Sequence, residues 1–143
     1  MYMLLKNLIN NLPEDKKKII VKGISTNSKE VKKGFIFFAI KGNKLNGEKF
    51  IKDAITKGAV VIICSQNCKF KSDFIYVIKT KNIRNLLSEI VSKFYRLKPK
   101  NIIAVTGTNG KTSVADFFYQ ILTINKIPAS YIGTLGIKYN KKV

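Results

Sequence analysis

The stretch Ile102-Ile103-Ala104-Val105-Thr106-Gly107-Thr108-Asn109-Gly110-Lys111-Thr112-Ser113 joins an apolar run to a loop that contains two glycines. The apolar run is rich in β-branched residues and predicts a buried strand, and the helical spacing of apolar residues after the loop predicts a helix. This order suits a nucleotide phosphate, because the first N–H groups of a helix lack intrahelical partners and attract negative charge.

The loop residues each suit one part of a nucleoside triphosphate. Gly107 and Gly110 let the backbone turn tightly around a phosphate. Lys111 is placed to neutralise the β- and γ-phosphates, and the hydroxyl of Thr112 is placed to ligate Mg²⁺. The general pattern G-x-x-x-x-G-K-[ST] has a glycine where this chain has Val105. The alternative interpretation is therefore a strand–turn–helix corner with a chance lysine.

The composition indicates a globular protein with a core of its own. Hydrophobic residues make up 45% of the 143 residues, and no apolar run approaches the length of a membrane span. Residues 1–7 lack the features of a signal peptide, so we expect a cytoplasmic protein. Cys64 and Cys68 are too few for a disulfide framework. With no histidine in the chain we do not expect a zinc site, and Cys64 suits a buried position.

The net charge of +19 raises the hypothesis of a nucleic-acid partner. The lysines are spread along the whole chain, and the densest run is only Lys16-Lys17-Lys18. A charge excess without a stripe or a fold motif favours solvated surface charge over a nucleic-acid footprint. A basic nucleic-acid-binding module remains an alternative.

Hydrophobic spacing predicts alternating helices and strands before the loop. We predict helices over residues 1–12, 48–57 and 82–97, and strands over residues 19–21, 35–40, 59–64 and 74–78. Pro99 breaks the chain after the last of these helices and marks a domain boundary. Residues 129–132 suit a second parallel strand after the loop helix. The residues after Pro99 are too few to cover both faces of a sheet, so we expect the front part of a longer protein.

Several motifs of the chain follow the order of one known family. Asn27-Ser28-Lys29 corresponds to D-S-R, residues 33–39 to P-G-D-L-F-V-A, and residues 42–47 to a loop bounded by glycines. Residues 106–112 are identical to T-G-T-N-G-K-T, a loop that does not use the missing first glycine. Over nearly its whole length the chain resembles the Mur ligases, the ATP-dependent amide-forming enzymes of peptidoglycan synthesis. The G-T-x-G at residues 133–136 favours the tripeptide-synthetase (MurE) type.

The resemblance implies an α/β protein in two parts. Residues 1–98 would form a small N-terminal UDP-sugar-binding domain, with a mixed or parallel sheet flanked by helices. Residues 99–143 would begin a Rossmann-like central ATP-binding domain with its first strand, phosphate loop, helix and strand. Such ligases add the third amino acid to UDP-N-acetylmuramoyl-L-alanyl-D-glutamate through an acyl phosphate, with ATP and Mg²⁺. We expect a monomer without membrane contact, and we expect this chain alone to be inactive.

The resemblance also implies site residues, position by position. The nucleotide site would comprise Gly107, Thr108, Asn109, Gly110, Lys111, Thr112 and Ser113, with Lys111 catalytic and Thr112 on the metal. The UDP-sugar site would comprise Thr26, Ser28, Asn43, Lys44 and Leu45. Asn27, Lys29 and Asn46 stand where the family has Asp, Arg and Asp. Lysine does not replace arginine where a planar guanidinium group must make two parallel hydrogen bonds.

Other functions stay open at this point. The chain could belong to another Mur-type ligase, such as the enzyme that adds D-alanyl-D-alanine, or to a generic phosphate-loop NTPase. It could also be a structural remnant without activity. The polar residues around Ser28 and Leu45 have an equally plain interpretation as ordinary turn residues. The sequence does not tell whether the added amino acid is meso-diaminopimelate or lysine.

Overall fold

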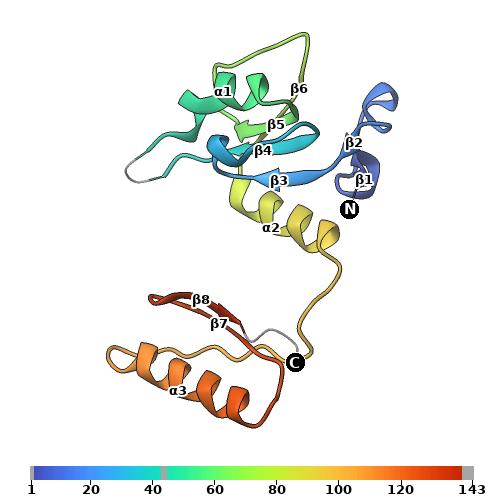
Figure 1. The fold of residues 1–143 in the computed structure, drawn as a ribbon. Coiled ribbons are helices and arrows are strands. Elements are labelled where there is room, and N and C mark those ends of the chain that lie inside the picture. The colour runs from blue at the N-terminus through green and yellow to red at the C-terminus, as the bar shows by residue number, and fades with distance from the viewer. Residues whose placement is uncertain (1, 43–44, 140–143) are drawn as a thin grey trace. The chain divides into compact units, whose positions relative to one another are not determined.

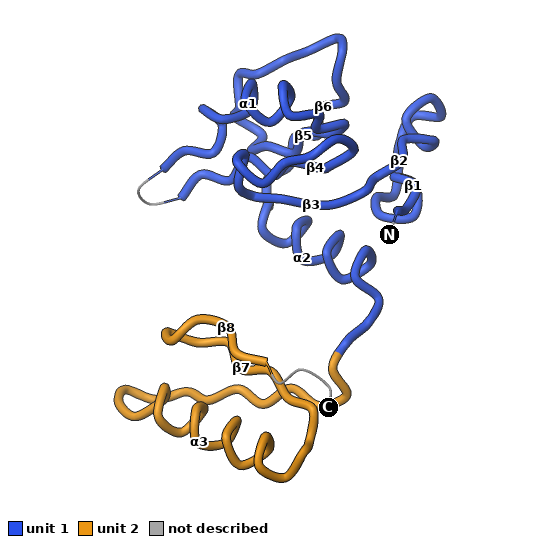
Figure 2. The backbone as a smooth tube through the Cα atoms, viewed as in Figure 1, with its two compact units in different colours: residues 1–98 blue, residues 99–143 orange. Residues whose placement is uncertain are grey.

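The structure, a computed structural model, describes residues 2–42 and 45–139. The chain divides into two compact units, unit 1 (residues 1–98) and unit 2 (residues 99–143), coloured separately in Figure 2. In the described ranges, every helix is too short or too polar to cross a membrane.

The described part of unit 1 is built on a parallel four-stranded sheet in the order β3-β4-β5-β6 (Figure 1). Strand β3 spans Gly23–Ser25, β4 Phe35–Ala39, β5 Ala59–Ser65 and β6 Tyr76–Thr80. The two central strands, β4 and β5, consist almost entirely of buried apolar residues. Continuous apolar strands are typical of parallel sheets, because helices or loops cover both faces.

Alternate residues of β4 and β5 supply two hydrophobic clusters, as the two-residue period of a strand requires. One cluster includes Ile36, Phe38 and Ile63 and packs with α2, which spans Ile83–Phe94. The other cluster includes Phe37 and Ile62 and packs with α1, which spans Ile51–Thr56. A short 3₁₀ turn over Gly47–Phe50 leads into α1. Figure 1 shows the two helices on opposite faces of the sheet.

The predicted helix over residues 1–12 is wrong. Strand β1 (Met3–Leu4) pairs antiparallel with β2 (Ile20–Val21), and 3₁₀ turns follow at Leu5–Asn7 and Glu14–Lys16. Leu5 and Leu8 are nevertheless buried. A single 3₁₀ turn is enough to place Leu5 and Leu8, which are three residues apart, on one side. Backbone pairing with β2 then outweighed a helical preference that is weak in so short a segment.

The other predicted elements of unit 1 are confirmed, with shifted ends. Strand β6 begins two residues after the predicted start, and α2 ends at Phe94 rather than near residue 97. The side chain of Asn82 caps α2 by accepting the N–H of Asn85 at 3.3 Å. Cys64 is fully buried, as expected. A 3₁₀ turn over Ser28–Glu30 connects β3 to β4.

Unit 2 contains α3 (Lys111–Ile124) and an antiparallel hairpin of β7 (Ser130–Gly133) and β8 (Gly136–Tyr139). The predicted parallel strand over residues 129–132 is therefore antiparallel. Its partner follows after only two residues, and a parallel crossover needs a dozen or more. The predicted strand over residues 102–105 has no partner strand among the described residues, and Ile102 is 80% exposed.

Most large apolar side chains of α3 are exposed in the described part of unit 2. The exposed ones are Val114, Phe117, Phe118, Ile121 and Ile124, and Leu122 is half-buried. Among the described residues of unit 2, Tyr131 is the only one whose apolar side chain is buried. The apolar core of the described structure therefore lies in unit 1.

Candidate functional site

The predicted phosphate loop ends at the first residue of α3. Gly110 precedes the helix with φ +75°, a left-handed conformation that side chains other than glycine rarely adopt. A Cβ atom added to Gly110 would meet no atom within 4 Å, so the space beside it is open. The N–H of Val114 makes a 3.0 Å hydrogen bond to the Gly110 carbonyl. Gly110 offers no capping side chain. The N–H groups at the start of α3, before that of Val114, therefore suit an anion.

The side chain of Lys111 folds back over the loop. Its Nζ donates hydrogen bonds to the carbonyl oxygens of Gly107 and Thr108, the second at 2.9 Å. An ammonium group has three donors, so a further one remains for a phosphate oxygen. The loop carbonyls hold the positive charge of Lys111 beside the start of α3, where a bound phosphate would lie.

The hydroxyl of Thr112, the predicted metal ligand, pairs with the hydroxyl of Thr134 at 2.8 Å. Thr134 lies in the turn between β7 and β8, within the G-T-x-G segment. From the sequence alone, that segment distinguishes ligase types and is not predicted to lie at the phosphate loop. The G-T-x-G motif was the one sequence signal that pointed to Thr134. Its contact with Thr112 depends on how the hairpin packs on α3.

An ion pair holds the hairpin against α3. Lys138 of β8 donates to Asp116 of α3, and Gln120 donates to the other carboxylate oxygen at 2.6 Å. Lys138 and then Gln120 lower the pKa of Asp116, and Asp116 raises the pKa of Lys138. The Lys138 ammonium also lies 5.7 Å from the ring centre of Tyr131. These contacts fix the turn that carries Thr134.

The candidate UDP-sugar residues of unit 1 lie after the carboxyl ends of parallel strands. Ser25 ends β3 and Ser65 ends β5, and the loop over residues 41–47 follows β4. Carboxyl ends of parallel strands meet at one edge of a sheet, where ligands of open α/β sheets bind. The fold thus brings the turn with Thr26 and Ser28 to the same edge as the loop with Leu45.

The turn after β3 is held by its own polar groups. The Ser25 hydroxyl donates to the Asn27 carbonyl at 2.9 Å, and the Asn27 N–H donates back to that hydroxyl at 3.0 Å. The Asn27 side chain accepts the N–H of Lys29 at 3.0 Å and donates to Glu30 at 3.2 Å. Thr26 is exposed, whereas Ser28 is only 6% exposed.

Asn43 and Lys44 lie outside the described residues. On either side of them, Lys41 and Asn46 form an antiparallel bridge, and Leu45 is exposed. The Asn46 side chain accepts the N–H of Glu48 at 3.1 Å. A Cβ atom added to Gly47 would lie 2.6 Å from the Ile40 carbonyl oxygen, so this close backbone approach requires glycine.

The asparagines that depart from the family motifs retain a structural role. Asn27 and Asn46 each accept a backbone N–H two residues ahead and begin a 3₁₀ turn. An aspartate oxygen would accept the same bond, because both residue types form such turns. The substitution therefore removes a negative charge without removing the hydrogen bond.

Sequence reasoning missed one polar contact at this edge. The Ser65 hydroxyl donates to Glu48 at 2.6 Å. Neither residue belongs to a family motif, and they lie 17 residues apart in the chain, with Ser65 at the end of β5 and Glu48 before α1. The sequence carries no signal that would have paired them.

Taken together, the fold and site define an α/β protein with a candidate phosphate loop at a helix N-terminus. Comparison with family models extends this description. Residues 20–95 match the model "Mur ligase family, catalytic domain", and residues 105–143 match "Mur ligase middle domain". The chain belongs to the Mur ligase family.

Curated relatives carry the same family assignment. The UDP-N-acetylmuramoyl-L-alanyl-D-glutamate–2,6-diaminopimelate ligase of Rickettsia prowazekii (strain Madrid E) is 44% identical over 118 residues, covering 82% of this chain and 24% of the relative. The ligase of the same name from Brucella melitensis biotype 1 is 38% identical over 131 residues, covering 91% and 27%. This chain thus spans about a quarter of the length of these relatives.

Solved structures share the fold. A UDP-N-acetylmuramoyl-L-alanyl-D-glutamate–2,6-diaminopimelate ligase matches with a TM-score of 0.71 and 22% identity, covering 97% of this chain and 29% of that one. The MurF ligase of Thermotoga maritima, solved in complex with ADP, matches with a TM-score of 0.58 and 28% identity, covering 73% and 24%.

Proposed function

We propose that this chain provides the UDP-sugar-binding domain and the phosphate loop of an ATP-dependent amide ligase. The reaction would join an amino acid to the free carboxylate of UDP-N-acetylmuramoyl-L-alanyl-D-glutamate, in the cytoplasm. The relatives' names favour 2,6-diaminopimelate as that amino acid. Because the chain spans about a quarter of its relatives, ligation is assigned to the longer protein and binding to this chain.

The observation that carries the proposal is the geometry at the start of α3. A left-handed Gly110 opens the helix, the Lys111 ammonium is held over the loop, and the Thr112 hydroxyl lies beside them. These groups fit a nucleoside triphosphate and its Mg²⁺, since they offer N–H donors, a positive charge and a neutral oxygen. An ADP-bound structure among the family neighbours supports the nucleotide part.

Each part of the chain would have a separate task. Bound ATP supplies the phosphoryl group that activates the substrate carboxylate as an acyl phosphate. Lys111 would stabilise negative charge on the phosphates, which is the main contribution of a protein to phosphoryl transfer. Thr112 would hold Mg²⁺. Thr26, Ser28, Leu45 and the neighbouring Asn43 and Lys44 would bind the UDP-sugar.

Calorimetry on the complete 143-residue chain tests the substrate part. We expect UDP-N-acetylmuramoyl-L-alanyl-D-glutamate to bind with measurable heat and Ser28→Ala to weaken that binding. As a matched control, Ser88→Ala changes a serine that is exposed on α2 and should leave the affinity unchanged. Absence of binding by the unaltered chain would contradict the substrate assignment.

Nucleotide binding is tested separately with a fluorescent ATP analogue. We expect Lys111→Ala to weaken ATP binding at least tenfold, because it removes the charge-assisted hydrogen bonds to phosphate. Lys126→Ala, two residues beyond the far end of α3, is the control for loss of one positive charge. Equal effects of the two variants would show that only net charge matters and would contradict a phosphate site at Lys111.

A further inference from the structure

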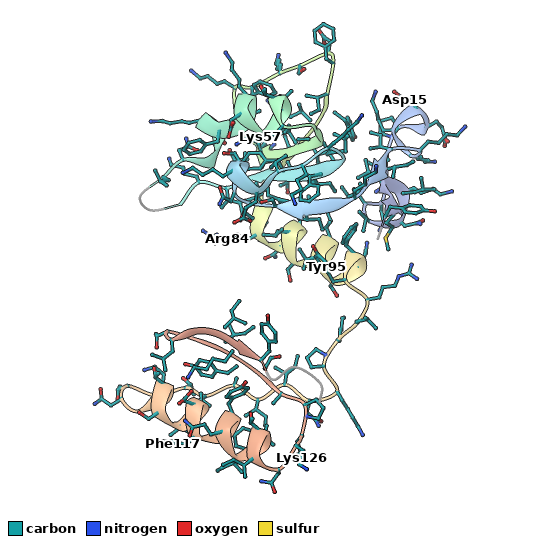
Figure 3. All side chains as sticks on the ribbon, in the orientation of Figure 1. Asp15, Lys57, Arg84, Tyr95, Phe117 and Lys126 are labelled. Carbon is teal, nitrogen blue, oxygen red and sulfur yellow. The ribbon has the colours of Figure 1, made fainter. Side chains whose placement is uncertain are left out.

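Asp53 and Lys57 connect α1 to the turn that carries Ser28. Lys57 Nζ lies 2.9 Å from Asp53 Oδ2 and donates a second hydrogen bond, of 3.2 Å, to the backbone carbonyl of Ser28. Lys57, labelled in Figure 3, thus links Asp53 and Ser28 into a cluster of three residues.

The cluster is local rather than part of the hydrophobic core. The side chains of Lys57 and Asp53 are 36% and 43% exposed, whereas Ser28 is buried. Ion pairs with this exposure contribute little to global stability. Their effect is expected on the conformation of the turn, which they hold from a helix far away in the sequence.

Resting on the proposed function, we propose that Asp53 and Lys57 are positioning residues of the UDP-sugar site. They hold the turn that carries Ser28 through the hydrogen bond from Lys57 to the Ser28 carbonyl, while Asp53 fixes the Lys57 ammonium.

Calorimetry with UDP-N-acetylmuramoyl-L-alanyl-D-glutamate at pH 7.5 tests the positioning role in the full chain. Asp53→Ala and Lys57→Met should each weaken binding about tenfold, an effect comparable with loss of one charge-assisted hydrogen bond. Thermal unfolding should change little because the pair is exposed. Asp53→Glu should restore most of the affinity. Lys52→Met, at an exposed lysine on the same helix, is the matched control.

Amide hydrogen exchange, measured without ligand, tests the positioning role of Asp53 and Lys57 independently of the proposed function. Exchange over residues 28–31 should be faster in Asp53→Ala and Lys57→Met than in the unaltered chain, and unchanged in Lys52→Met. Unchanged exchange in both cluster variants overturns the positioning role. Failure of the unaltered chain to bind the UDP-sugar contradicts the proposed function, and the exchange rates still decide whether Asp53 and Lys57 hold the turn.

Discussion

The hydroxyl oxygens of Thr112 and Thr134 lie 2.8 Å apart and join the start of α3 to the turn of the β7–β8 hairpin. This contact brings the phosphate loop and the G-T-x-G segment, 22 residues later in the chain, to one place. A hydrogen bond between the two hydroxyls would orient the oxygen that we propose Thr112 offers to a metal ion. The hairpin therefore belongs to the candidate nucleotide site rather than lying beside it.

Thr134→Val tests this contact. We expect the variant to weaken nucleotide binding in the presence of Mg²⁺ about fivefold, the equivalent of ~1 kcal/mol for one neutral hydrogen bond. Binding of the nucleotide without Mg²⁺ should stay the same, because only the orientation of a metal ligand is lost. Titrations of a fluorescent ATP analogue with and without Mg²⁺ measure both values. An equal loss in the two conditions would contradict a role toward the metal.

Asn27 allows a test of the turn after β3. Asn27→Asp should leave the turn intact, because aspartate accepts the Lys29 N–H in the same way. Asn27→Ala should destabilise it by roughly 1 kcal/mol, the usual loss for an N-terminal capping side chain. Amide exchange at Lys29 reports the change directly. Similar exchange rates in the two variants would show that the asparagine oxygen does not hold the turn.

Cys64 is expected to resist alkylation. Burial, with a smaller contribution from Cys68, raises the pKa of the Cys64 thiol to about 12, and the thiolate is the reactive form. At pH 8 the folded chain should react with iodoacetamide far more slowly at Cys64 than the urea-unfolded chain. Peptide mass spectrometry of the alkylated cysteine follows both rates. Equal rates would show that Cys64 is accessible in the folded state.

Two phenylalanines should differ sharply in their contribution to stability. Phe38 of β4 is fully buried, whereas Phe117 of α3 is 62% exposed. Phe38→Ala should lower the free energy of unfolding by about 3–5 kcal/mol, as expected for a core phenylalanine. Phe117→Ala should change it by less than ~0.5 kcal/mol, as for most surface substitutions. Urea unfolding followed by circular dichroism compares the variants.

The ion pair between Asp116 and Lys138 predicts a pH dependence. The folded pKa of Asp116 is lowered, chiefly by Lys138. Its contribution to stability is therefore present above the ordinary aspartate pKa and is lost as the pH falls through the lowered value. The carboxyl carbon of Asp116 should titrate by NMR below the ordinary range. Lys138→Met should move the midpoint upward, and an unmoved midpoint would contradict the assigned cause.

Much of unit 1 could be predicted from the sequence because its signals are local. The continuous apolar runs of β4 and β5 predict buried strands, and Asn82 with the apolar spacing after it predicts α2. The loop from Gly107 to Thr112 predicts a tight turn before a helix, and Gly110 makes that turn in a left-handed conformation. Each of these signals depends on neighbours within a few residues.

The tertiary structure decided what depends on distant partners. Residues 3–4 became a strand because β2 offered backbone groups to pair with, and residues 130–133 became half of an antiparallel hairpin because their partner follows directly. The contacts of Thr112 with Thr134 and of Lys57 with Ser28 join segments far apart in the chain. Local sequence determined most elements of unit 1 and the start of α3, and long-range packing determined the remaining strands and which side chains meet around each candidate site.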